Sequence, residues 1–153
     1  MRLAFLAATM VAVLAVDASE PSLWTDNGRP NGDAVEALAV LRESAAEGLD
    51  PRDYGVDDLE REAAAVGQAL TFENHLTATL ARYLSDLHQG RLDPRAIGFS
   101  LQVPDDRHDY AAVIAEAARA HRVRALVSAW RPQLAQYRLL AEALRRARAQ
   151  APP

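Results

Sequence analysis

The stretch LTATLARYLSDLHQGRLDP, from Leu76 to Pro94, decides the fold. Its large apolar side chains recur at offsets of four, seven, eight and eleven residues, which places them on one stripe of an α-helix: Leu76, Leu80, Tyr83, Leu84 and Leu87. Gly90 supplies the permissive backbone with which helices end, and Pro94 prevents the chain from resuming the helix at once. The pattern predicts a helix over residues 71–89 at the centre of an all-α domain.

Length and composition set limits on the possible chemistry. The chain has 153 residues, half of them hydrophobic and a quarter charged, as is typical of a single globular domain. A domain of this size buries roughly 70% of its unfolded surface and needs no metal or disulfide for stability. Cysteine and lysine are absent, which excludes disulfides, thiolate ligands, a thiol nucleophile and a lysine Schiff base within this chain. We expect no cofactor and no metal.

The charge of the chain is unevenly distributed around a net value of −4. From Arg119 to the end there are eight arginines and one acid, Glu142, whereas the rest has nine arginines and twenty acids. One interpretation is that a basic C-terminal helix packs beside acidic surfaces of its own domain. The alternative is an anionic partner, such as a cell-wall polymer or lipid headgroups. Nucleic acid is not expected, because the chain is acidic overall and lacks basic–aromatic interleaving.

The N-terminus has the pattern of an export signal. Arg2 is followed by an uncharged, mostly apolar run over residues 3–16, and Ala18 precedes a cleavage point at Ser19. Fourteen apolar residues are too few to span a bilayer comfortably. A cytoplasmic N-terminal helix and an uncleaved anchor are the alternatives. We therefore divide the chain into a signal peptide (1–18), an extended lead-in (19–32), a helical domain (33–149) and a tail (150–153).

The sequence GLDPRDY, residues 48–54, is dense in turn signals. Gly48 can adopt the left-handed conformation that ends a helix, and Leu49 can then contact the helix end. Asp50 can cap a new helix, and Pro51 suits a first turn that has no N–H to lose. The segment predicts a helix, a sharp turn and a short helix.

The remaining segments predict a single compact bundle of about five to seven helices, joined by short Gly and Asp-Pro turns. We expect helices capped by Asp33, by Asp57 or Asp58, and by Asp109, a short one over residues 123–130, and a last one with Pro132 in its first turn. Each has an apolar stripe. The stripes of the first two and the last comprise Val35, Leu38, Leu41 and Ala45; Leu59, Ala63 and Val66; and Leu134, Tyr137, Leu140, Ala141 and Leu144. Trp24 should pack onto the domain, and residues 96–103 should form an irregular crossover.

No catalytic motif is present. The four histidines are not spaced as metal ligands, and the chain has no GxSxG, P-loop, GxGxxG or HExxH sequence. The acids at the start of the helix after Gly55 are typical of a solvated first turn. A hydrolase or transferase that uses Asp86 and Asp93, flanked by Arg91, is a weaker alternative, because Asp–Pro turns usually serve the backbone.

With these segments placed, the chain resembles the N-terminal helical scaffold domain of the large periplasmic L,D-transpeptidases, which cross-link peptidoglycan in Gram-negative bacteria. The likeness covers residues 24–148. The residues that carry it are Gly48, Leu49, Asp50, Pro51 and Tyr54; Tyr83, Asp86, Leu87, Gly90, Arg91, Asp93 and Pro94; and Pro132, Tyr137, Leu140, Ala143 and Leu144. The resemblance implies a helical scaffold fold, a periplasmic location and a cell-wall context.

The chain departs from that family in one large respect. In the family, a peptidoglycan-binding module and a catalytic domain with a Ser-x-Gly-Cys motif follow the scaffold, whereas this chain has no cysteine. We therefore expect a module that is not an enzyme, either a truncated remnant or a free scaffold. Its expected partners are peptidoglycan or a cell-wall enzyme. An exported helical binding protein of unrelated role is the alternative.

Overall fold

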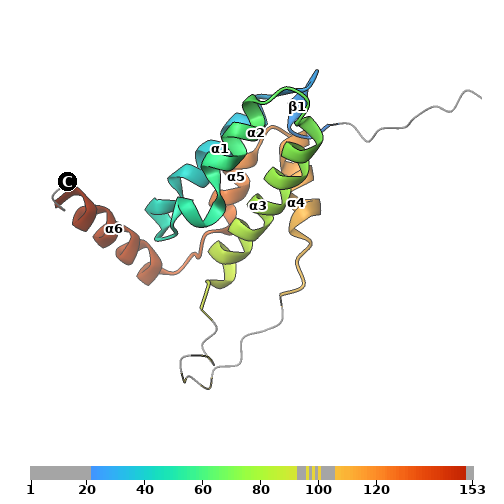
Figure 1. The fold of residues 1–153 in the computed structure, drawn as a ribbon. Helices are drawn as coiled ribbons and strands as arrows, with labels where there is room; N and C mark the ends of the chain where they lie inside the picture. The colour runs from blue at the N-terminus through green and yellow to red at the C-terminus, as the bar shows by residue number, and fades with distance from the viewer. Residues whose placement is uncertain (1–21, 93–95, 97, 99, 101–105, 151–153) are drawn as a thin grey trace, which may run out of the picture.

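The protein is described here by a computed structural model that covers residues 22–92, 96, 98, 100 and 106–150 (Figure 1). Within these ranges the chain forms six α-helices, two short 3-10 helices and one small hairpin. In chain order they are β1 (Thr25–Asp26), β2 (Arg29–Pro30), α1 (Gly32–Arg42), η1 (Glu43–Glu47), η2 (Pro51–Tyr54), α2 (Val56–Ala64), α3 (Ala69–Gln89), α4 (Tyr110–Arg119), α5 (Val123–Trp130) and α6 (Ala135–Gln150). The prediction of an all-α bundle is confirmed.

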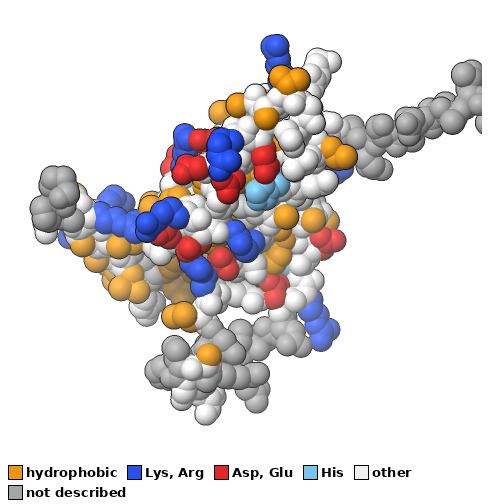
Figure 2. Space-filling model, in the orientation of Figure 1, with side chains coloured by type: hydrophobic (Ala, Val, Ile, Leu, Met, Phe, Trp, Pro, Cys, Tyr) orange, Lys and Arg blue, Asp and Glu red, His pale blue; other side chains and the backbone are white. Residues whose placement is uncertain are grey.

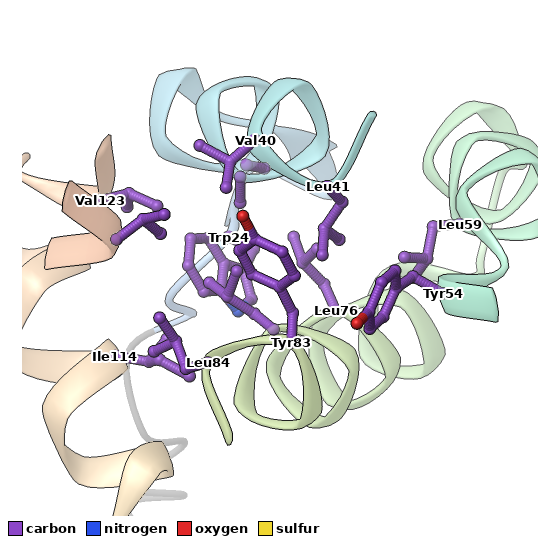
Figure 3. Close-up of a cluster of buried hydrophobic side chains, with 14 of the residues drawn as sticks. Trp24, Val40, Leu41, Tyr54, Leu59, Leu76, Tyr83, Leu84, Ile114 and Val123 are labelled. Atoms are coloured by element: carbon purple, nitrogen blue, oxygen red, sulfur yellow. The ribbon is translucent and has the colours of Figure 1, made fainter. Parts of the chain in front are cut away.

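Helix α3 is the centre of the bundle, as its apolar stripe predicted. It contacts α1, α2, α4 and α5. Its buried face consists of Phe72, Leu76, Thr79, Leu80, Tyr83, Leu84 and Leu87. Figure 3 shows this face meeting side chains from α1, α2, α4 and α5, with Trp24 and Tyr54 inside the same cluster. The hydrophobic effect of this shared burial is what holds the five helices together.

The lead-in before α1 is anchored rather than loose. Trp24 is fully buried, as expected, and its indole N–H donates to the Thr77 hydroxyl at 2.8 Å. The Glu73 carboxylate on α3 accepts hydrogen bonds from the backbone N–H of Leu23 at 3.0 Å and of Trp24 at 2.9 Å, and from the Thr25 hydroxyl at 2.9 Å. The antiparallel pairing of β1 with β2 then turns the chain into α1.

The start of α1 differs from the prediction. Asn31, not Asp33, is the cap, because its side-chain oxygen accepts the N–H of Ala34 at 3.0 Å. Asp33 lies inside the helix, nearly buried, with its carboxylate 2.7 Å from Nδ1 of His121. The expected stripe is confirmed in part: Leu41 is fully buried and Leu38 packs against the core. Val35 is exposed instead, and Ala34, Ala37 and Val40 complete the buried face.

Helix α2 begins and ends earlier than predicted. It starts at Val56, which follows Gly55 in the left-handed conformation, rather than at Asp57 or Asp58. It ends at Ala64, so Val66 lies beyond it and is fully exposed instead of joining the core. By contrast, Asp109 caps α4 as expected and accepts the N–H of Ala112 at 3.0 Å.

Helix α6 stands apart from the other five. It extends away from the bundle in Figure 1, where it is coloured red, and it has no buried residue. It begins at Ala135, so Pro132 precedes the helix instead of lying in its first turn. Of the predicted stripe, Tyr137 and Leu144 are half-buried, whereas Leu134 and Leu140 are exposed.

Several predictions lie outside the described residues. They are the signal peptide over 1–18, most of the crossover over 96–103, the end of the tail, and Asp93 with Pro94. Among the helices that are described, none is long and apolar enough to cross a membrane.

Candidate functional site

The GLDP turn forms as its residues predicted. Gly48 ends η1 in the left-handed region, with φ of 85°, and its N–H donates to the carbonyl of Ala45 at 3.1 Å. Asp50 then caps η2 by accepting the N–H of Arg52 at 3.0 Å, with Pro51 in the first turn. The turn therefore reverses the chain within a few residues and delivers Tyr54 to the side of α3.

A hydrogen bond joins this turn to the end of α3. The Tyr54 hydroxyl donates to the Asp86 carboxylate at 2.8 Å, and its ring packs edge to face on Tyr83 with centroids 5.4 Å apart. Burial and the bond to the Asp86 carboxylate both raise the pKa of Tyr54 above its usual range. Arg91 pairs with Asp53 and places its Nε 3.9 Å from Asp86. Two motifs far apart in the sequence thus meet in one place.

A second polar cluster joins η1 to the start of α6. The Glu47 side chain is only 9% exposed and pairs with Arg131 at 2.7 Å, while the Tyr137 hydroxyl donates to it. Burial and the nearby Glu47 carboxylate raise the pKa of Tyr137, and they raise that of Tyr83 to about 12. Glu47 is the last residue of η1, and Arg131 lies in the segment that precedes α6. Their ion pair therefore holds that segment against the bundle.

Between these two clusters lies a groove of about 760 Å³. One side is formed by the Gly48 turn and the C-terminal end of α3, and the other by the segment leading into α6 and its first turns. Nine of the seventeen residues that carry the family resemblance line it: Gly48, Leu49, Asp86, Leu87, Gly90, Arg91, Pro132, Tyr137 and Leu140. Asp50, Pro51, Tyr54 and Tyr83 do not line it and instead support its walls. Asp93 and Pro94 lie outside the described residues.

The hydrophobic side chains of α6 gather along one side of the helix in Figure 2, with arginines on the opposite side. Leu134 and Leu140 line the groove, whereas Leu139 does not. Within the described ranges, no group of three or more His, Asp or Glu side chains is arranged to hold a metal ion. The arrangement offers apolar surface beside paired charges, which suits the binding of another molecule.

The sequence did not identify every residue that shapes the groove. Glu47 and Arg131 were missed, although each directly precedes a residue that was singled out, Gly48 and Pro132. A partly buried ion pair between residues far apart in the chain has no local signal, because neither partner lies on a predicted stripe. Only the three-dimensional arrangement shows that they pair.

Comparison with known proteins gives one match. The model of a family described as Scaffold domain matches residues 18–144, which is most of the chain. No curated protein matches, and no solved structure matches.

Proposed function

Because the chain belongs to the Scaffold domain family, we propose that it is a non-catalytic scaffold that positions other components through its surface. The observation that carries this proposal is the groove. Its acids, Glu47 and Asp86, are held by Arg131, Tyr137 and Tyr54. Three of its leucines, Leu92, Leu134 and Leu140, are exposed. Paired acids of this kind stabilise the walls of the groove. The exposed apolar surface between them is suited to contact with a partner.

We further propose a cell-wall context. It is supported by the resemblance of residues 24–148 to the helical scaffold domain of the large L,D-transpeptidases, a span that largely coincides with residues 18–144 of the family match. In this proposal the chain is exported by its N-terminal signal to the periplasm, and it assists L,D-transpeptidase-type cross-linking of peptidoglycan without forming or breaking a bond itself. Its partner is peptidoglycan or a cell-wall enzyme.

Fractionation and affinity capture test this proposal together. The full chain with a C-terminal affinity tag is expected in the periplasmic fraction, with a mature N-terminus at Ser19 by mass spectrometry. Capture after mild cross-linking is expected to recover wall fragments or wall enzymes. An intact Met1 in the cytosolic fraction would contradict export, and an eluate free of both classes would contradict the cell-wall role.

A murein digestion assay addresses the weaker alternative of a carboxylate-based hydrolase. The purified chain is expected to release no soluble fragments, and Asp86→Ala and Asp93→Ala to behave like the parent. Turnover by the parent that either substitution abolishes would replace the scaffold proposal with an enzymatic one.

A further inference from the structure

A second groove, of about 350 Å³, lies between α4 and α5 and shares no lining residue with the groove beside α6. Both helices contribute to its apolar lining, which consists of Val113, Ala117, Ala125, Leu126 and Ala129. The whole lining lies within residues 113–129, and none of the described residues that adjoin an undescribed segment belongs to it.

The turn between α4 and α5 is held in one conformation. The N–H of His121 donates to the carbonyl of Ala118 at 2.9 Å, and the N–H of Arg122 donates to that of Ala117 at 2.8 Å. His121 has a positive φ of 53°, and its Nδ1 lies 2.7 Å from the carboxylate of the nearly buried Asp33. The angle between the two helices is therefore fixed before any partner binds, which lowers the entropic cost of binding.

Two charged side chains line this groove, one of each sign. They are Glu116 of α4 and Arg122, which directly precedes α5. Both are exposed, and neither forms an ion pair with any residue that the structure describes. The neighbouring arginines do not contribute, because Arg119 lines a different pocket and Arg124 pairs with Glu43. The groove thus combines an apolar lining with one acid and one base.

These charges select among the surfaces that could cover the groove. An anionic membrane or polymer would place negative charge against Glu116, and a cationic surface would place positive charge against Arg122. A suitable partner is apolar and carries one base and one acid in the opposite order. The α4–α5 surface of a second copy has this pattern, because a two-fold axis brings each residue against the counterpart of its neighbour.

We propose that two copies of this chain associate through their α4–α5 grooves. The four helices pack as a bundle, with the apolar linings facing each other and Glu116 of each copy beside Arg122 of the other. The apolar contact supplies most of the binding, and the two charge pairs set the relative orientation of the copies. This inference goes beyond the proposed scaffold function and does not depend on it.

Sedimentation of the purified chain between ~2 and ~500 μM tests whether it self-associates. Because the groove is small, we expect a weak dimer with a Kd of ~10–100 μM. At ~2 μM the chain should be monomeric, so variants with substitutions at exposed groove residues should keep the parent melting temperature there. Salt should weaken the dimer, because its charge pairs lie at the surface.

Charge reversals give the sharpest test, because two-fold symmetry lets two variants rescue each other. Glu116→Arg and Arg122→Glu should each weaken self-association at least ~10-fold, since each brings like charges together twice. A mixture of these two variants, one of them fluorescently labelled, should associate with a Kd within ~3-fold of the parent, since all facing charges are then opposite. Arg119→Glu is the matched control, exposed on α4 but outside the groove, and should change the Kd less than ~2-fold.

A second matched pair on α5 tests the apolar contact. Ala125 and Ser128 are both exposed, but only Ala125 lines the groove. Ala125→Gln places a long side chain in the contact and should weaken the dimer ~10-fold, whereas Ser128→Gln should weaken it less than ~2-fold.

Three results would overturn the proposal. A parent that stays monomeric up to ~500 μM would leave the groove to a different protein. A dimer that both charge reversals and Ala125→Gln leave intact would be formed by another surface. If the two reversal variants keep the parent melting temperature but do not associate when mixed, the two-fold contact is excluded.

The proposed function and this inference fail in different experiments. If the purified chain is monomeric but affinity capture recovers wall components, the scaffold role stands and this inference fails. If the mixed variants restore the dimer but capture recovers no wall component, the dimer stands and the cell-wall role fails.

Discussion

Helices α3 and α6 each carry a stripe of apolar residues, but they occupy different surroundings. Seven residues of α3 are buried and four other helices contact it. Helix α6 has no buried residue, and its main contact is with η1. A stripe at helical spacing thus predicts a helix, whereas burial depends on whether neighbouring elements cover that stripe. The groove lies where the covered helix ends and the uncovered one begins.

The largest expected difference in stability is between two leucine substitutions, one on α3 and one on α6. Leu80→Ala in α3 should lower the free energy of unfolding by ~2–5 kcal/mol, because it opens a cavity in a fully buried site. Its counterpart on α6, Leu139→Ala, should change it by no more than ~0.5 kcal/mol, because Leu139 is exposed. Urea denaturation measures both. Similar losses for the two variants would show that α6 shares the core.

Removal of the carboxylate that anchors the lead-in on α3 should give the next largest loss of stability. Glu73→Ala removes the acceptor of three hydrogen bonds and leaves two backbone N–H groups and one hydroxyl without their partner. We expect a loss of ~1.5–3 kcal/mol in the free energy of unfolding. Glu116→Ala, at an exposed site on α4, is the control and should stay within ~0.5 kcal/mol. Equal stability of the two variants would show that Glu73 does not anchor the lead-in.

A substitution in the Gly48 turn, which forms one side of the groove, should lower the stability by a smaller amount. Gly48→Ala should destabilise by ~1–2 kcal/mol, because Gly48 has a positive φ. An added Cβ would meet Leu144 only at an ordinary 3.7 Å, so the cost comes from the backbone. Gly32→Ala, in a helical conformation with nothing within 4 Å of the new Cβ, should be neutral or stabilising. An unchanged melting temperature for Gly48→Ala would contradict the turn as described.

Alkaline pH should weaken the core beside the groove by the smallest amount. Burial raises the pKa of Tyr83 to about 12, above the ~10 of an unfolded tyrosine. A raised pKa gives stability that is complete below pH ~10 and is lost as the pH rises towards 12. From Tyr83 we expect a loss of ~1 kcal/mol in the free energy of unfolding between pH 9 and 11. Tyr83→Phe should show a shallower decline over that interval; an identical decline would exclude Tyr83 as its source.

Local signals were sufficient to predict much of the fold. The stripe of α3, the left-handed Gly48, the cap at Asp50 and the cap at Asp109 all appear as expected. Each depends on residues within a few positions of one another, so the sequence contains the whole cause. The burial of Trp24 also follows, because a large apolar ring in a polar segment is most stable against the domain.

Errors arose where distant residues compete with local preferences. Asp33 has the side chain of a cap, but Asn31 occupies that position and Asp33 instead meets His121 from the turn between α4 and α5. Val66 fits the stripe of α2, but the helix ends before it at Ala64. No spacing within α1 or α2 reveals these outcomes, because they depend on how other elements pack.

The site was only partly predictable for the same reason. The residues that carry the family resemblance were identified in the sequence, but their convergence on one groove appears only in the fold. Tyr54 and Asp86 are separated by 32 positions, and Glu47 and Tyr137 by 90. Family membership of the chain and the geometry of the groove therefore support the scaffold proposal from independent directions.

Hydrogen exchange along the full chain tests the central contrast most directly. Amides of α3 should exchange only through global unfolding, and those of α6 much faster through local opening, because few buried contacts hold that helix. Equal protection of α3 and α6 in the free chain would contradict the account, since α6 would then belong to the core and leave no open groove to fill.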